Sequence, residues 1–246
     1  MSNTENYNII KNMRCLWGGL LIVSLVSCSN SQFNDNEAQP EKTVFEGVNT
    51  AESVIAIRQE RQRIVILGDS LTYGYGLDRS ESYPFLLQKR LDRSGNDYEV
   101  VNAGVSGDTS AGGLRRLNWV LEGDVRVLII ELGANDGLRG LPVASLRHNL
   151  SEIIERTQEK GIAVVLTGME APPNYGSVYT QEFREVYQEL ARTYQVYFVP
   201  FLLEGVAGNP DLNLTDGIHP NASGARIVEE TLWDTLKPLL MSSRND

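Results

Sequence analysis

The chain has 246 residues, and its 32 acidic and 22 basic side chains give a formal charge of −10. This charge repels nucleic-acid phosphates unless a local basic patch offsets it, and the sequence contains no such patch. The only two cysteines, Cys15 and Cys28, lie near the N-terminus, so the rest of the chain cannot form a disulfide, a zinc-cysteine site or a cysteine nucleophile.

The N-terminus has the features of an export signal. Lys11 and Arg14 precede an uncharged apolar run, residues 16–26, which is too short to span a bilayer comfortably. The run ends in LVSC, which resembles the lipobox of bacterial lipoproteins, where cleavage before the cysteine leaves its thiol to carry a lipid. We therefore expect residues 1–27 to be a lipoprotein signal peptide and Cys28 to be lipidated. An ordinary signal peptide and an uncleaved anchor helix are the alternatives.

The residues after Cys28 predict a tether followed by one domain. Residues 29–43 are polar and have almost nothing to bury, so residues 28–61 are expected to form a linker. The stretch AESVIAIRQE at 51–60 fits equally well a short helix docked on the domain. No internal repeat or second domain boundary follows residue 61, so residues 62–246 are predicted to form a single domain.

The body alternates short β-branched runs with longer amphipathic stretches. The runs predict strands at residues 64–68, 98–103, 125–133, 162–168 and 196–200. Apolar residues recur at helical spacing in 142–160, where Gly161 is a stop signal, and residues 222–240 predict a closing helix. This alternation is typical of an α/β fold in which crossover helices cover both faces of a parallel sheet.

Polar residues follow the predicted strands. Ser70 comes directly after the first strand, Gly107 lies beyond the second, and Asn135 follows the third. The loop after the last strand supplies Asp216 and His219. Since ligands of open α/β sheets bind beyond the carboxyl ends of the strands, we expect these residues to converge at one edge.

These residue types can perform nucleophilic catalysis. A serine hydroxyl needs a neighbouring base, and His219 is the histidine in an edge loop, whereas His148 falls opposite an apolar stripe and is predicted to be a solvated surface residue. Asp216 can accept a hydrogen bond from one ring nitrogen of His219, although an aspartate before a glycine also commonly organises a turn. Asp69 and Asp136 are weaker candidates, because aspartates at strand ends often cap helices.

Ester cleavage also needs donors for the developing oxyanion. The backbone N–H groups of Ser70 and Gly107 and the side-chain amide of Asn135 are candidates. Taken singly, Gly107 fits a turn glycine and Asn135 a loop-stabilising amide.

Four blocks together resemble the SGNH, or GDSL-type, hydrolase family: GDSLTYGYG at 68–76, NAGVSGDTS at 102–110, ELGANDGLRG at 131–140 and DGIHP at 216–220. The similarity is closest to the bacterial periplasmic thioesterase and lysophospholipase branch, which PPNYG at 172–176 also resembles. It implies a flavodoxin-like three-layer α/β/α sandwich with a five-stranded parallel sheet of order 2-1-3-4-5. It also implies a triad of Ser70, Asp216 and His219, an oxyanion hole of Ser70, Gly107 and Asn135, and no cofactor or metal.

The sequence therefore predicts a serine ester hydrolase that forms an acyl-enzyme on Ser70. Lysophospholipids, aryl esters and acyl thioesters are the expected substrates. The alternatives are a polysaccharide O-acetyl esterase and a non-catalytic surface-binding lipoprotein, and a long apolar groove would favour lipids over sugars. The expected location is the outer membrane, facing the periplasm through the anchor on Cys28, with a soluble periplasmic protein as the alternative.

Overall fold

A parallel sheet forms the centre of the fold in the computed structural model, which describes residues 61–242. The sheet has five strands in the order β2-β1-β3-β4-β5, so the predicted topology is confirmed. The strands are β1 (Gln62–Gly68), β2 (Tyr98–Gly104), β3 (Val125–Glu131), β4 (Ala163–Thr167) and β5 (Tyr197–Val199).

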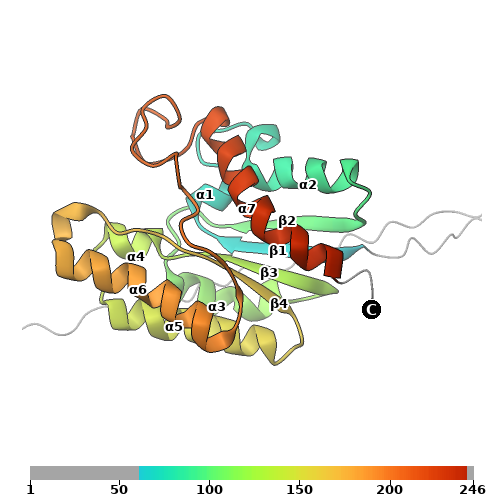
Figure 1. Cartoon of the computed structure of the whole chain (residues 1–246), viewed down its shortest axis with the longest axis horizontal. Coiled ribbons are helices and arrows are strands. Elements are labelled where there is room, and N and C mark those ends of the chain that lie inside the picture. Colours follow the sequence, from blue (N-terminus) through green and yellow to red (C-terminus); the bar gives the residue numbers. More distant parts are fainter. Residues whose placement is uncertain (1–60, 243–246) are drawn as a thin grey trace, which may run out of the picture. The chain divides into compact units, whose positions relative to one another are not determined.

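Helices cover both faces of the sheet, which makes three layers (Figure 1). One face carries α2 (Tyr83–Arg93) and α7 (Ala222–Ser242), and the other carries α3 (Ser110–Val120), α5 (Val143–Gln158) and α6 (Ser177–Tyr194). Four short elements complete the described chain: the helices α1 (Ser70–Tyr73) and α4 (Ala134–Leu138) and the 3-10 turns η1 (Arg79–Glu81) and η2 (Pro173–Tyr175). The central strands are buried on both faces, which explains why they read as nearly continuous apolar runs.

The strand register aligns the chain segments that carry polar residues. Gly68, the last residue of β1, pairs with Gly104 of β2 on one side and with Glu131 of β3 on the other. A Cβ atom on Gly68 would lie 2.0 Å from the Thr72 hydroxyl oxygen, so only glycine allows the chain to turn this tightly from β1 into α1. The turn places Ser70 at the carboxyl edge of the sheet.

β3 ends two residues earlier than the run 125–133 predicts, because Gly133 leaves the strand. Gly133 has φ 114°, a conformation that side chains other than glycine rarely adopt, and it caps the N-terminus of α4. A Cβ atom there would also lie 1.9 Å from the Tyr187 hydroxyl. This early turn carries Asn135 to the same edge as Ser70.

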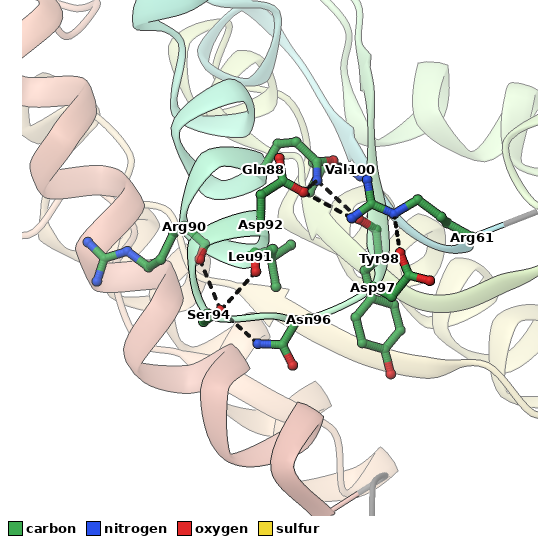
Figure 2. Close-up of polar contacts among 10 residues, drawn as sticks. All are labelled: Arg61, Gln88, Arg90, Leu91, Asp92, Ser94, Asn96, Asp97, Tyr98 and Val100. Carbon is green, nitrogen blue, oxygen red and sulfur yellow. Dashed lines mark hydrogen bonds and ion pairs between the residues drawn. The ribbon is translucent and has the colours of Figure 1, made fainter.

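The open edge of the sheet at β2 is capped by one side chain, as Figure 2 shows. Gln88 of α2 donates from Nε2 to the carbonyl of Tyr98 at 3.0 Å, and its Oε1 accepts the N–H of Val100 at 2.6 Å. These bonds occupy backbone groups that would otherwise be free to pair with another strand.

The predicted signal peptide and tether lie outside the described residues except for Arg61, which pairs with Asp92 at 2.9 Å and Asp97 at 2.7 Å (Figure 2). The boundaries predicted at residues 27 and 61 stay predictions. Between residues 61 and 242, no helix has both the length and the apolar character needed to cross a membrane.

Candidate active site

Ser70 is the first residue of α1, directly after β1. The preceding residue, Asp69, caps this short helix, and its Oδ1 accepts the N–H of Leu71 at 3.0 Å. The cap fixes the position of Ser70, which is half-buried, just beyond the carboxyl end of β1.

The structure brings Ser70, His219 and Asp216 into one chain of hydrogen bonds. His219 Nε2 lies 2.9 Å from Ser70 Oγ, and His219 Nδ1 lies 2.7 Å from Asp216 Oδ2. Because a carboxylate only accepts, the proton belongs on Nδ1, which leaves Nε2 free to accept the Ser70 hydroxyl proton. The arrangement can therefore convert the Ser70 hydroxyl into a nucleophile.

Backbone contacts within its loop and one ring contact hold His219 in place. The His219 carbonyl accepts the N–H of Leu214 at 2.7 Å, and the turn at Gly217 has φ 70°. The imidazole also packs against the Tyr75 ring, with 4.5 Å between the ring centroids. These contacts limit the rotation of the imidazole and keep Nε2 directed at Ser70.

Asp216 is both the turn residue and the partner of the imidazole, so the two roles that the sequence left open coexist. Its Oδ1 accepts the N–H groups of Ile218 at 2.9 Å and His219 at 3.0 Å. The hydrogen bonds from the His219 backbone and then from its side chain lower the pKa of Asp216 to about 2. The carboxylate is consequently ionised throughout the pH range in which an imidazole is neutral.

The two other predicted oxyanion donors lie at the same edge. Gly107 and Asn135 line one cleft together with Ser70, and Gly107 has φ 83°. The Arg139 guanidinium connects them, because its Nη2 donates to the Gly107 carbonyl at 2.8 Å and lies 3.5 Å from Asn135 Oδ1. Sequence reasoning did not identify Arg139, although it lies in the ELGANDGLRG block.

The cleft beside Ser70 has a volume of about 650 Å³, a size typical of small-molecule sites. Several of the side chains that line it are apolar, and two of these, Leu138 and Ile218, are 41% and 47% exposed. The predicted PPNYG segment contributes Pro172 and Pro173. The cleft can hold an apolar group next to the Ser70 hydroxyl.

A buried acidic pair underlies the nucleophile turn. The Asp69 and Glu131 side chains are both fully buried, and burial raises the pKa of Asp69 to about 6 and that of Glu131 well above its usual range. Glu131 Oε2 accepts the N–H of Asp69 at 3.0 Å and the hydroxyl of Thr72 at 2.7 Å. Glu131 was not among the predicted site residues. The sequence feature that could have identified it is a carboxylate at the end of an apolar run.

Neither of the other described candidates, Asp136 and His148, takes part in the hydrogen bonds of the triad. Asp136 is buried and accepts the N–H and the hydroxyl of Ser110 at 2.8 and 2.6 Å, which ties α4 to the start of α3. His148 is exposed on α5, as predicted, and Cys28 lies outside the described residues. Within residues 61–242, no group of three or more histidine, cysteine, aspartate or glutamate side chains is placed to hold a metal ion.

Comparison with known proteins identifies relatives over most of the described chain. Residues 66–227 match the model of the GDSL-like Lipase/Acylhydrolase family. The chain is 46% identical over 180 residues to Esterase TesA of Pseudomonas aeruginosa, which covers 73% of this chain and 90% of that protein. It is 36% identical over 178 residues to Thioesterase 1/protease 1/lysophospholipase L1 of Escherichia coli K12, which covers 72% of this chain and 84% of that protein.

A solved structure has the same fold. The psychrotrophic esterase EstA from Pseudoalteromonas sp., in a crystal structure inhibited by monoethylphosphonate, superposes with a TM-score of 0.69. It is 36% identical in sequence, and the match covers 73% of this chain and 98% of that one.

Proposed function

Because the chain belongs to the GDSL-like Lipase/Acylhydrolase family and is a carboxylic ester hydrolase, we propose that it cleaves fatty-acyl esters, lysophospholipids among them, through an acyl-enzyme on Ser70. The observation that carries this proposal is the hydrogen-bonded chain of Ser70, His219 and Asp216 at 2.9 and 2.7 Å. In this role Asp216 holds the imidazole, His219 moves the proton and Ser70 bonds to the acyl carbon.

The reaction has two halves. His219 Nε2 takes the Ser70 proton while Oγ attacks the acyl carbon, and it returns that proton to the departing alcohol as the ester C–O bond breaks. His219 then takes a proton from water as the water oxygen attacks the acyl carbon, and it returns that proton to Ser70 Oγ as the bond between the acyl carbon and Oγ breaks and the carboxylic acid leaves. In both halves, the N–H groups of Ser70 and Gly107 and the Asn135 amide are proposed to bind the oxyanion.

The apolar wall of the cleft supports fatty-acyl substrates. This wall consists of the larger apolar side chains that line the cleft: Leu138, Met169, Pro172, Phe201, Leu203 and Ile218. An acetyl group would leave this wall in water, whereas a longer acyl chain would cover it, and each buried methylene is worth about 0.8 kcal/mol. Acyl thioesters fit the same chemistry, but an exported enzyme would not meet acyl-CoA made inside the cell.

A panel of p-nitrophenyl esters tests the substrate class. We expect kcat/KM to rise about fourfold per added methylene until the cleft is filled, which corresponds to 0.8 kcal/mol each. Leu138→Ser should reduce this chain-length preference, and Trp119→Ser, which removes an equally apolar side chain that is 65% exposed and does not line the cleft, should leave it unchanged.

A lysophospholipid and an acetylated polysaccharide complete the panel. Acetyl esters cleaved fastest, together with release of acetate from the polysaccharide, would contradict the fatty-acyl proposal and favour the O-acetyl esterase. No hydrolysis of any ester would favour the non-catalytic alternative.

We propose that the enzyme is a lipoprotein held at the outer membrane through Cys28. In this proposal, residues 1–27 are removed, residues 28–61 form the tether and residues 62–246 form the hydrolase domain. The support is LVSC at the end of the apolar run 16–26, and the SN that follows lacks the aspartate that often retains similar lipoproteins at the inner membrane.

Mass spectrometry of the mature N-terminus tests the anchor. Cells that express the full chain should yield an N-terminal Cys28 that carries lipid, and Cys28→Ser should release the enzyme from membranes. A mature protein that begins at another residue, or an unmodified Cys28, would contradict the anchor and leave the proposed ester hydrolysis untouched.

A further inference from the structure

Asp69 contacts two parts of the proposed machinery with its two carboxylate oxygens. Oδ1 accepts the N–H of Leu71 at 3.0 Å, and Oδ2 accepts Nδ2 of Asn135 at 3.0 Å. The first bond lies within the helix that begins at Ser70, whereas the second reaches 66 residues along the chain to α4. Asp69 therefore does more than cap a helix, which is the role that its sequence position suggested.

The contact with Asp69 determines which way the Asn135 amide faces. An asparagine amide has a donating end and an accepting end, and a flip exchanges them. Here the donating end faces the Asp69 carboxylate, and the accepting end faces the Arg139 guanidinium at 3.5 Å. A flipped amide would set its oxygen against the carboxylate and its NH₂ against the guanidinium, so both contacts favour the observed orientation.

We propose that Asp69 is a positioning residue that holds the Asn135 amide so that its second Nδ2 proton is available to the oxyanion. This inference rests on the proposed function, in which Asn135 is an oxyanion donor. One Nδ2 proton is used by Asp69 and one remains, and Asn135 lines the cleft beside Ser70. An amide free to rotate would have to be ordered during each reaction, which weakens an oxyanion hole that depends on donors already in place.

Glu131 holds the backbone of Asp69 in place for this role. Its Oε2 accepts the backbone N–H groups of Asp69 at 3.0 Å and Thr72 at 3.3 Å, and all three side chains are fully buried. The Asp69 backbone cannot shift without breaking these bonds. With the backbone held, only the side-chain torsions of Asp69 could still move its carboxylate. The bonds to Leu71 and Asn135 fix those torsions.

Asp69→Asn tests the proposal with almost no change in shape. Its side chain has one acceptor where Asp69 has two, so either the Leu71 N–H or the Asn135 amide would face another donor. We expect kcat to fall about 10- to 100-fold while KM changes less than about threefold, because the oxyanion exists only in the transition state. The matched control is Asp78→Asn, which alters the exposed N-cap of η1 and should leave both constants unchanged.

A double-mutant cycle decides whether Asp69 acts through Asn135. Asn135→Ala alone should lower kcat by roughly 10²- to 10³-fold, and adding Asp69→Asn to it should lower kcat by less than about threefold more. An equal loss from Asp69→Asn in both backgrounds would overturn the proposal, because Asp69 would then act through α1 and Ser70 alone. An unchanged kcat in Asp69→Asn would also overturn it.

Asp69→Ser separates capping from positioning. Serine is a good N-cap, but its single short oxygen cannot also reach Asn135, so α1 should keep its cap while kcat falls as in Asp69→Asn. Normal kcat in this variant would overturn the proposal.

Amide proton exchange in the wild-type protein supplies a readout that needs no variant of Asp69. With the Asn135 side-chain signals assigned by their loss in Asn135→Ala, one Nδ2 proton should exchange more slowly than those of exposed Asn118. Fast exchange of both protons would overturn the proposal. A wild-type protein without esterase activity would instead reject the proposed function, while the exchange result would still report on the Asp69 contact.

Discussion

Ser70→Ala should lower kcat for ester hydrolysis by roughly 10⁵- to 10⁶-fold, the largest loss we expect from any single substitution. The alanine lacks Oγ, the proposed attacking atom, which lies 2.9 Å from His219 Nε2. His219→Ala should cause a loss of similar size, and the double variant should be no worse than either one, because nucleophile and base act as a unit. Initial rates on a p-nitrophenyl ester measure all three variants.

The matched control for this prediction is Ser106→Ala, which removes another serine hydroxyl that lines the same cleft. It should keep kcat within about twofold of the wild type, because no step of the proposed reaction uses the Ser106 hydroxyl. Substantial turnover by Ser70→Ala at high enzyme concentration would show that another group attacks the ester.

Asp216→Ala should lower kcat by roughly 10⁴-fold, the next largest loss after those of Ser70→Ala and His219→Ala. The variant removes the acceptor 2.7 Å from His219 Nδ1, so the imidazole can adopt the tautomer that places a proton, not a lone pair, toward Ser70. It also removes the acceptor of the Ile218 and His219 N–H groups, which form the turn. Asp211→Ala, an exposed aspartate in the same loop, is the control and should retain activity.

The ionisation of Asp216 gives this prediction a pH dependence with a defined sign. Because the folded pKa is about 2 and the ordinary value is 3.8, the carboxylate stabilises the fold fully above about pH 4 and loses this contribution as the pH falls through 2. The wild type and Asp216→Ala should therefore converge in stability in strong acid.

A loss of activity that appears only below pH 4 in the wild type would show that Asp216, and not the imidazole, limits the rate.

Most of the fold was predictable because each buried strand reads as an apolar run. All five strands begin and end within two residues of the predicted runs, and the early end of β3 arises from Gly133. β5 is one residue shorter than its predicted run at each end, and at the C-terminal end the next residue is Pro200, which has no N–H to pair. Sequence periodicity does not detect such a shortening when the flanking residues are themselves apolar.

The candidate site was predictable where each residue follows a strand, and less so where contacts link distant segments. Ser70 and Asn135 lie at the edge where parallel strands end, so their meeting follows from topology. The contacts of Glu131 with Thr72 and of Arg139 with Gly107 depend on side-chain packing between separate segments of the chain. No local sequence pattern encodes these contacts. The bond between Asp69 and Asn135 also joins distant segments, so the sequence predicted only a helix cap for Asp69.

The central claim is that Ser70 is an activated nucleophile, and a fluorophosphonate probe tests it most directly. Attack on phosphorus needs the same activated hydroxyl and the same oxyanion donors as attack on an ester. Peptide mapping of the treated protein should place a single adduct on Ser70, and labelling should be lost in Ser70→Ala and strongly slowed in His219→Ala. An adduct on a different serine, or labelling of Ser70 that does not depend on His219, would contradict the account.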